Sequence, residues 1–262
     1  MGLVFPDNCR ICDAPLSGVS RVPVCPRCLA APRPLASEYA CVNCHAPFVN
    51  RHPLDDEGRC GLCRRGLTGF DAAFAFGSYE GELRKLIQLF KYGGTPTLAR
   101  PLGMLLASAL PREKAFDLVV PMPMHWRRRW SRGFNQAELL ADVLAARLGF
   151  AKLNAVRRRK ATPPQAGLTG AQRRKNMSGA FKVRNADRIR GKRILLVDDV
   201  LTTGSTAAAC ARALKRAGAA YVAVITVARA DRRMVDVTGP GPDRFETSPL
   251  GGVLDAQSGS TA

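Results

Sequence analysis

The stretch ILLVDDVLTTGST at residues 194–206 decides the fold and points to the chemistry of the chain. Four aliphatic residues at 194–197 predict a strand that is buried on both faces, as in a parallel sheet. Two carboxylates, Asp198 and Asp199, follow at the C-terminal end of this strand, where open α/β sheets bind their ligands. A hydroxyl-rich turn then leads into an alanine-rich helix, which we expect from Ala207 to about Ala217.

The turn has the composition of an anion-binding loop. Its residues are Thr202, Thr203, Gly204, Ser205 and Thr206. Backbone N–H groups and hydroxyls at a helix N-terminus can surround an anion, and the carboxylates can hold sugar hydroxyls or Mg²⁺. The pattern therefore predicts a sugar-phosphate site. A plainer interpretation is a strand end whose solvated acidic pair caps the next helix, but the full thirteen-residue pattern favours the site.

The segment resembles, at every position, the phosphoribosyl pyrophosphate (PRPP) signature of type I phosphoribosyltransferases. In that family the two acids hold the ribose 2- and 3-hydroxyls, and the following loop wraps the 5-phosphate. The resemblance implies that Asp198 and Asp199 bind the ribose of PRPP and that residues 202–206 bind its phosphate, with Mg²⁺ as a cofactor.

Length and composition indicate a globular protein. A chain of 262 residues allows one α/β domain and a smaller module, and a hydrophobic content of 46% is ordinary. No stretch approaches the roughly 18 apolar residues of a membrane helix. The first residues, MGLVFPDNCR, lack the pattern of a secretory signal, so we expect a cytoplasmic protein without membrane insertion.

The chain is strongly basic, with 40 Lys and Arg against 21 Asp and Glu and a net charge of +19. Such an excess favours polyanions, which include nucleic acids, anionic membrane surfaces and phosphorylated small molecules. Solubility alone can also maintain a charge excess. The charge therefore indicates classes of partner without assigning one.

Eight of the nine cysteines form four CxxC pairs in the first 63 residues. The pairs are Cys9/Cys12, Cys25/Cys28, Cys41/Cys44 and Cys60/Cys63. A CxxC turn aims two sulfurs at one point, and two such turns complete a closed Cys₄ zinc site with a structural role. We expect the first two pairs to share one Zn²⁺ and the last two the other, although spacing leaves an interleaved or nested pairing open. A reducing compartment argues against the alternative of disulfides.

Two further residues have plain interpretations. His45 follows Cys44 and could replace a zinc ligand, but the expected role is that of a neighbour of the site. Cys210 lies within the helix after the phosphate loop and is expected to be a small buried hydrophobe.

The remaining pattern alternates strands and helices. Strands are predicted at 70–79, 117–120 and 221–227, and helices at 80–92, 98–110 and 134–148. The expected fold class is α/β: a type I phosphoribosyltransferase-like parallel sheet flanked by helices, preceded by a small Cys₄ zinc-ribbon module. The predicted division is residues 1–66 for the zinc module, 67–231 for the phosphoribosyltransferase-like domain and 232–262 for a disordered tail.

Several other stretches resemble the ComF-type proteins, which are associated with bacterial DNA uptake. They are FKY at 90–92, VPMP at 120–123, RGFNQA at 132–137, Gln165, Leu168, Arg173, Asn176, and GAF at 179–181. The resemblance covers roughly residues 5–230. Many of these proteins join N-terminal zinc knuckles to a phosphoribosyltransferase-like domain.

The expected reaction indicates where cations are needed. Phosphoribosyl transfer breaks the C1–O bond to pyrophosphate through an oxocarbenium-like centre, so the leaving group requires positive charge, part of it from Mg²⁺. In related enzymes the loop after the strand equivalent to 117–120 binds pyrophosphate, and here this loop includes Met122 and Arg132. A mobile loop at 160–176 would bring Lys160, Gln165 and Arg173 to the diphosphate. Solvated surface charge is the plain alternative for each basic residue. Arg132 is the strongest catalytic candidate beside the acid pair.

Two functions remain open from the sequence. The first is a Mg²⁺- and PRPP-dependent transferase with an unknown acceptor. The alternative is a non-catalytic protein that binds single-stranded DNA and DNA-uptake proteins during natural transformation, since Trp126, Trp130 and Phe134 lie among arginines. The plainer interpretation of these three aromatics is that Phe134 packs under its own helix and that the tryptophans cover the loop. A glutamine amidotransferase is not expected, because residue 2 is glycine and Cys9 belongs to a CxxC pair.

Overall fold

The computed structural model describes residues 8–16, 21–66, 69–124, 130, 132–159 and 179–230. The helices and strands in chain order are α1 (Pro26–Ala30), β1 (Tyr39–Ala40), β2 (Pro47–Phe48), α2 (Gly61–Arg64), β3 (Ala72–Ser78), α3 (Gly81–Tyr92), the 3₁₀ helix η1 (Pro96–Leu98), α4 (Ala99–Ser108), β4 (Leu118–Pro121), α6 (Gln136–Leu148), β5 (Ala151–Lys152), β6 (Val156–Arg158), β7 (Phe181–Val183), η2 (Ala186–Arg188), β8 (Arg193–Leu201), α8 (Ser205–Arg216) and β9 (Tyr221–Arg229). Within these residues no helix is long and apolar enough to cross a membrane.

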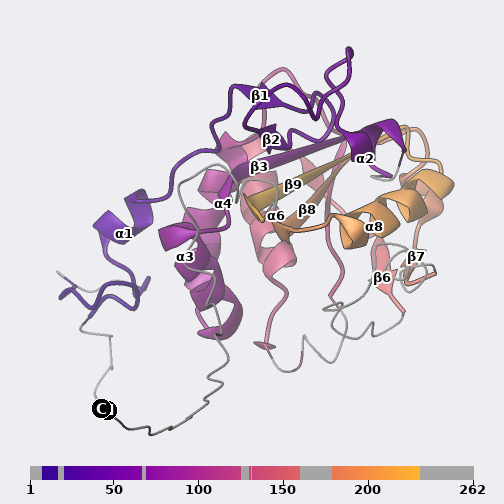
Figure 1. The fold of residues 1–262 in the computed structure, drawn as a ribbon. Coiled ribbons are helices and arrows are strands. Elements are labelled where there is room, and N and C mark those ends of the chain that lie inside the picture. The colour runs from indigo at the N-terminus through magenta and orange to yellow at the C-terminus, as the bar shows by residue number, and fades with distance from the viewer. Residues whose placement is uncertain are drawn as a thin grey trace, which may run out of the picture.

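A five-stranded parallel sheet in the order β3-β9-β8-β4-β5 forms the centre of the protein (Figure 1). Its middle strands β8 and β9 carry the buried aliphatic runs, which confirms the predicted α/β class. Strand β8 is longer than the predicted 194–197. It continues to Leu201 because β9 keeps pairing with it, through Asp198↔Thr226 and Val200↔Ala228.

Helices cover both faces of the sheet (Figure 1). Buried side chains of α3, α4 and α6 form one core with residues such as Leu195 and Val197 of β8. Buried residues of α8, which include Cys210 as expected, form the other core with Ile194 and Leu196. This alternation along β8 explains why its aliphatic run has no polar face.

The N-terminal region forms two cysteine-rich units, one against each face. Cys9, Cys25 and Cys28 join the core beneath α3 and α4, whereas Cys41, Cys44 and Cys60 join the core beneath α8. The segment 33–43 between the units follows the outer edge of β3. There Leu35 N–H donates to Phe76 O and Asn43 O accepts from Ala73 N. This contact covers an edge strand that would otherwise present unpaired backbone groups.

The segment at 33–43 lies so close to β3 that a glycine is needed. A Cβ atom at Gly77 would lie 2.6 Å from the carbonyl oxygen of Arg33. Gly77 therefore permits the close approach of two backbones.

A second, antiparallel pair of strands was not predicted. β6 and β7 pair from Val156↔Val183 to Arg158↔Phe181, and Arg159 N–H donates to Ala180 O. The pair brings together the two ends of the segment predicted as a mobile loop. That loop, at 160–176, lies outside the described residues, as does the predicted tail at 232–262.

Candidate functional site

A pocket of about 270 Å³ opens where β4 and β8 part. From β4 the chain continues through α6 to β5 at one edge of the sheet, and from β8 it continues through α8 to β9 on the other side. Such a reversal of direction leaves a crevice beyond the carboxyl ends of the strands, where open α/β sheets bind ligands. The pocket brings together these predicted residues: Met122, Arg132, Asp198, Asp199, Thr202, Gly204 and Thr206.

The acid pair lies beyond the end of β4. Pairing of β4 with β8 reaches Pro121↔Val197, and Met122 N–H also donates to Val197 O at 2.8 Å. The next part of β8 borders the pocket, where the backbone N–H of Asp199 donates to Asp198 Oδ1 at 2.9 Å. Because β4 has ended, it offers no partner to the Asp199 N–H. The Asp198 side chain supplies that partner.

The two carboxylates have different cationic neighbours. Asp199 Oδ1 lies 2.9 Å from Lys91 Nζ at the end of α3. Asp198 lies near Arg158 of β6 and near Cys210 of α8, where burial and, secondarily, the charge of Asp198 raise the pKa of the Cys210 thiol. Neither Lys91 nor Arg158 was predicted as a site residue.

Burial and neighbouring charges shift the pKa values of Asp198 and Lys91. Burial, together with the charge of Asp199, raises the pKa of Asp198 to about 7, although the Asp199 N–H, Lys91 and Arg158 act in the opposite direction. Burial alone would lower the pKa of Lys91, but attraction to Asp199 outweighs burial and raises this pKa. The Lys91 ammonium therefore stays charged at neutral pH.

The predicted phosphate loop begins α8. Gly204 has a left-handed backbone (φ 71°) at the N-cap of this helix, a conformation that favours glycine. Thr203 Oγ1 and Ser205 Oγ lie 3.1 Å apart in the same turn. The helix N-terminus thus faces the pocket with backbone N–H groups and hydroxyls, as an anion requires.

A second helix N-terminus, that of α6, also lines the pocket. Asn135 caps α6 by accepting from Ala137 N at 3.2 Å, and its amide donates to Met122 O at 3.1 Å. One buried side chain therefore fixes both the helix and the loop after β4. Asn135 and Gln136 also line the pocket, and the RGFNQA stretch contained the signal for them.

Arg132 is held at the mouth of the pocket by two neighbours. It donates to Gln136 Oε1 at 3.4 Å and to Tyr92 Oη at 3.2 Å, and its guanidinium lies 4.8 Å from the centroid of the Tyr92 ring. The structure thus joins the FKY and RGFNQA stretches at one site. Lys160, Gln165 and Arg173 lie outside the described residues, although Arg158, near the start of that segment, lines the pocket.

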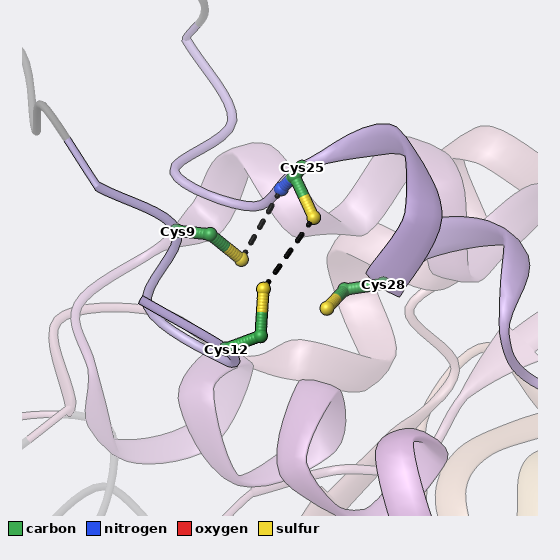
Figure 2. Close-up of side chains that lie close together, drawn as sticks. All are labelled: Cys9, Cys12, Cys25 and Cys28. Atoms are coloured by element: carbon green, nitrogen blue, oxygen red, sulfur yellow. Dashed lines mark hydrogen bonds between the residues drawn. The ribbon is translucent and has the colours of Figure 1, made fainter. Parts of the chain in front are cut away.

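The eight CxxC cysteines form two clusters in the sequential grouping. Within each cluster the sulfurs lie within 4.8 Å of one another, and all nine cysteines are free of disulfides. Figure 2 shows the first cluster, in which Cys12 Sγ and Cys25 Sγ are 3.7 Å apart. Four Zn–S bonds of about 2.3 Å in a tetrahedron place sulfurs about 3.8 Å apart, so the clusters fit structural zinc sites.

Both clusters contain the same type of N–H···S hydrogen bond. Cys25 N–H donates to Cys9 Sγ and Cys60 N–H to Cys41 Sγ, each at 3.3 Å (Figure 2 for the first). Burial opposes ionisation of Cys9, but N–H groups of Cys25 and of its own turn lower the pKa of the thiol to about 6. Such N–H···S bonds favour the thiolates that a metal needs.

His45 contributes to the fold of its cluster and is not among the clustered ligands of the described residues. It has a positive φ of 49° directly after Cys44, as Asp13 has (60°) after Cys12. Its ring stacks on Phe74 with centroids 5.0 Å apart. These contacts agree with the expected role as a neighbour.

Each cysteine unit also contacts the surroundings of the pocket. Arg10, between Cys9 and Cys12, donates to Gly93 O just after α3 at 3.2 Å. Arg229 donates to Cys44 O at 2.8 Å, and the register of β8 and β9 pairs Arg229 with Leu201, just before the phosphate loop. The clusters are therefore linked to two of the segments that carry pocket residues, the end of α3 and the end of β8.

Comparison with known proteins defines the class. The chain matches the phosphoribosyl transferase domain family over residues 131–238. Together with this match, the parallel sheet, the pocket and the predicted phosphate loop define a phosphoribosyltransferase-like protein with N-terminal Cys₄ units. It is 35% identical to Competence protein F of Haemophilus influenzae, over 65% of this chain and 78% of that protein. It is 32% identical to DNA utilization protein YhgH of Salmonella typhimurium, over 87% of this chain and 99% of that protein. The chain belongs to the ComF family.

Asp198, which is half-buried at the pocket, makes stability depend on pH. Because its native pKa of about 7 exceeds its ordinary value, the native protein loses stability as the pH rises through the range from about 4 to 7. Asp198→Asn removes the half-buried charge and keeps an oxygen for the Asp199 N–H. We expect it to raise the free energy of unfolding at pH 8 by on the order of 1–3 kcal/mol, with a smaller gain at pH 5.

Urea denaturation at the two pH values measures this difference. The exposed Asp187→Asn serves as a matched control and should change stability little at either pH. An Asp198→Asn protein that is less stable than the wild type at pH 8 would contradict the burial of a costly charge.

Proposed function

We propose that the pocket binds PRPP together with Mg²⁺. Asp198 and Asp199 accept hydrogen bonds from the ribose hydroxyls, and residues 202–206 bind the 5-phosphate. The observation that carries the proposal is that the acid pair, the phosphate loop and a second helix N-terminus all line one pocket. Carboxylate oxygens also suit Mg²⁺, which would supply positive charge to the diphosphate.

The leaving group would lie toward α6. Arg132 provides a fixed cation there, and Asn135 holds the loop that carries Met122. Lys160, Gln165 and Arg173 would approach from the segment between β6 and β7. Transfer of the phosphoribosyl group to an acceptor is the reaction that this arrangement supports, because positive charge on pyrophosphate assists C1–O cleavage.

Each Cys₄ unit is proposed to hold one structural Zn²⁺. The closed ligand sets leave no position for a substrate, so the metals would stabilise the units and not act in the reaction. None of the eight cysteines of the two units forms a disulfide, which supports a reducing, cytoplasmic location. The relatives named for competence and DNA utilization support a role in the use of incoming DNA, with DNA-uptake proteins as partners.

Calorimetric titration with PRPP tests the binding site. We expect saturable binding that Mg²⁺ strengthens at least about tenfold, because the diphosphate brings several negative charges next to the acid pair. Asp198→Asn combined with Asp199→Asn should abolish binding, whereas Asp187→Asn should leave it unchanged. Full binding by the folded double variant would rule out this pocket as the PRPP site.

Metal analysis tests the zinc proposal. The purified protein should contain two zinc ions per chain, one for each cluster. Cys12→Ser and Cys63→Ser should each reduce the content to one, while Cys210→Ala, which lies outside both clusters, should keep two. Two zinc ions retained in either serine variant would show that the clusters are not the ligands.

Single-stranded DNA binding is the second candidate. The net charge of +19 favours it, and the Trp130 side chain is 90% exposed near Arg132. Phe134 packs on Phe90 with centroids 5.6 Å apart, which agrees with the expectation that it packs beneath a helix and does not stack on bases. Trp126 lies outside the described residues.

Fluorescence anisotropy with a labelled oligonucleotide tests this candidate. We expect affinity to fall at least about tenfold between 50 and 200 mM salt if phosphates are bound. Trp130→Ala should weaken binding about tenfold if a base stacks there. The exposed Met104→Ala is the control and should bind like the wild type. Equal binding by both variants would exclude Trp130 from the interface.

A further inference from the structure

The two cysteine clusters place equivalent sulfurs in opposite surroundings. Cys12 and Cys44 are each the second cysteine of a CxxC pair, and each Sγ lies 3.7 Å from a sulfur of the other pair in its cluster. Each is followed by a residue with a positive φ, Asp13 (60°) or His45 (49°). Cys12 is nevertheless exposed, whereas Cys44 is only 3% exposed. Access to the sulfur therefore distinguishes the first cluster from the second.

A buried cation lies against the second cluster. Arg229, which is only 7% exposed, donates to Cys44 O at 2.8 Å, and its Nη2 lies 3.9 Å from Cys44 Sγ. A cation that stabilises a thiolate lowers its basicity and with it its nucleophilicity. Burial and Arg229 therefore both protect Cys44 from attack on an electrophile.

Zinc binding makes exposure the property that separates the sulfurs. Ligands of Zn²⁺ are thiolates, so all eight CxxC sulfurs would share the form that reacts with oxidants. Oxidation then follows access to solvent. Cys12 is exposed, Cys63 is partly exposed and the other six ligands are buried. Cys25 Sγ, 3.7 Å from Cys12 Sγ, is placed to be the second sulfur of a disulfide (Figure 2).

We propose that Cys12 is a modification site, at which peroxides oxidise the first cluster and release its zinc while the second cluster keeps its own. The Cys12 thiolate attacks one oxygen of hydrogen peroxide, so that an S–O bond forms, the O–O bond breaks and hydroxide leaves. The Cys25 thiolate then attacks Cys12 Sγ and expels the second hydroxide, which leaves a disulfide. Two sulfurs lose two electrons, and the peroxide with two protons from solvent becomes two waters. The proposal rests on the proposed zinc in the first cluster.

Loss of this zinc is expected to reach the pocket through Arg10. Arg10 belongs to the same CxxC turn as Cys12 and donates to Gly93 O at 3.2 Å, directly after the pocket residues Lys91 and Tyr92. A disulfide leaves two thiolates, too few for a closed zinc site, so the turn that positions Arg10 loses its metal. Amide hydrogen exchange at the end of α3 should therefore become faster in the oxidised protein.

Zinc release from the full zinc-loaded chain in hydrogen peroxide tests the proposal. A colorimetric chelator follows the released zinc, and peptide mass spectrometry follows the cysteines. We expect one zinc ion to leave at least about tenfold faster than the other, because only the first cluster has a fully exposed sulfur. When the first zinc has left, the disulfide should join Cys12 and Cys25, and the cysteines of the second cluster should still be reduced.

Variants assign the two release rates. Cys12→His keeps a zinc ligand that cannot form the disulfide, so it should hold two zinc ions and lose the fast release. Cys210→Ala, outside both clusters, is the control and should keep it. Arg229→Met should speed the slow release at least about threefold, whereas Arg229→Lys keeps a cation and should change it less.

The outcomes separate this proposal from the proposed zinc sites. Two zinc ions that leave at equal rates, or a first disulfide without Cys12, would overturn the role of Cys12 and leave the zinc sites in place. Fast release from Cys12→His loaded with two zinc ions would do the same. If Cys12→His holds one zinc ion, the disulfide map of the wild type decides. A purified wild type without zinc would overturn both proposals.

Discussion

Strand β4 ends at Pro121 while β8 continues to Leu201, and the candidate site depends on this difference in length. After Met122, whose N–H still donates to Val197 O, the chain continues through Pro123, which has no N–H group to donate to β8. Backbone groups on the β4 side of β8 beyond this point find hydrogen-bond partners within β8, as the Asp199 N–H does by donating to Asp198 Oδ1. Two carboxylates can border a pocket here because no neighbouring strand covers them on that side.

The cysteine units connect the candidate site to the rest of the molecule. They pack against opposite faces of one sheet and are joined along the edge of β3, so the N-terminal region is built into both cores. Arg10 reaches the backbone just beyond Lys91 and Tyr92, and Arg229 links Cys44 to the end of β9. Zinc in these units would therefore stabilise both the helix that carries Lys91 and the strands that precede the phosphate loop.

The central sheet and the main parts of the site could be predicted because they depend on local sequence. Buried aliphatic runs identify strands such as β8 and β9, and the left-handed glycine before α8 belongs to a continuous loop pattern. Gly149 ends α6 in the left-handed conformation, as the predicted boundary requires. Alternative groupings of the CxxC pairs remained open, because spacing alone does not determine which turns meet in space.

The features that could not be predicted depend on contacts between distant segments. The pairing of Lys91 with Asp199 joins residues 108 positions apart, and the Arg132–Tyr92 contact joins residues 40 positions apart. β6 and β7 are three residues each, too short for a periodic signal, and they pair across a long intervening segment. Packing of Phe134 beneath a helix could be expected, but sequence order does not reveal that its partner is Phe90.

A crystal structure of the zinc-containing protein grown with PRPP and Mg²⁺ tests the central claim most directly. The account predicts density for the 5-phosphate against residues 202–206, with the ribose hydroxyls within hydrogen-bond distance of Asp198 and Asp199. Density for the ligand at another surface, with this pocket filled only by water, would contradict it.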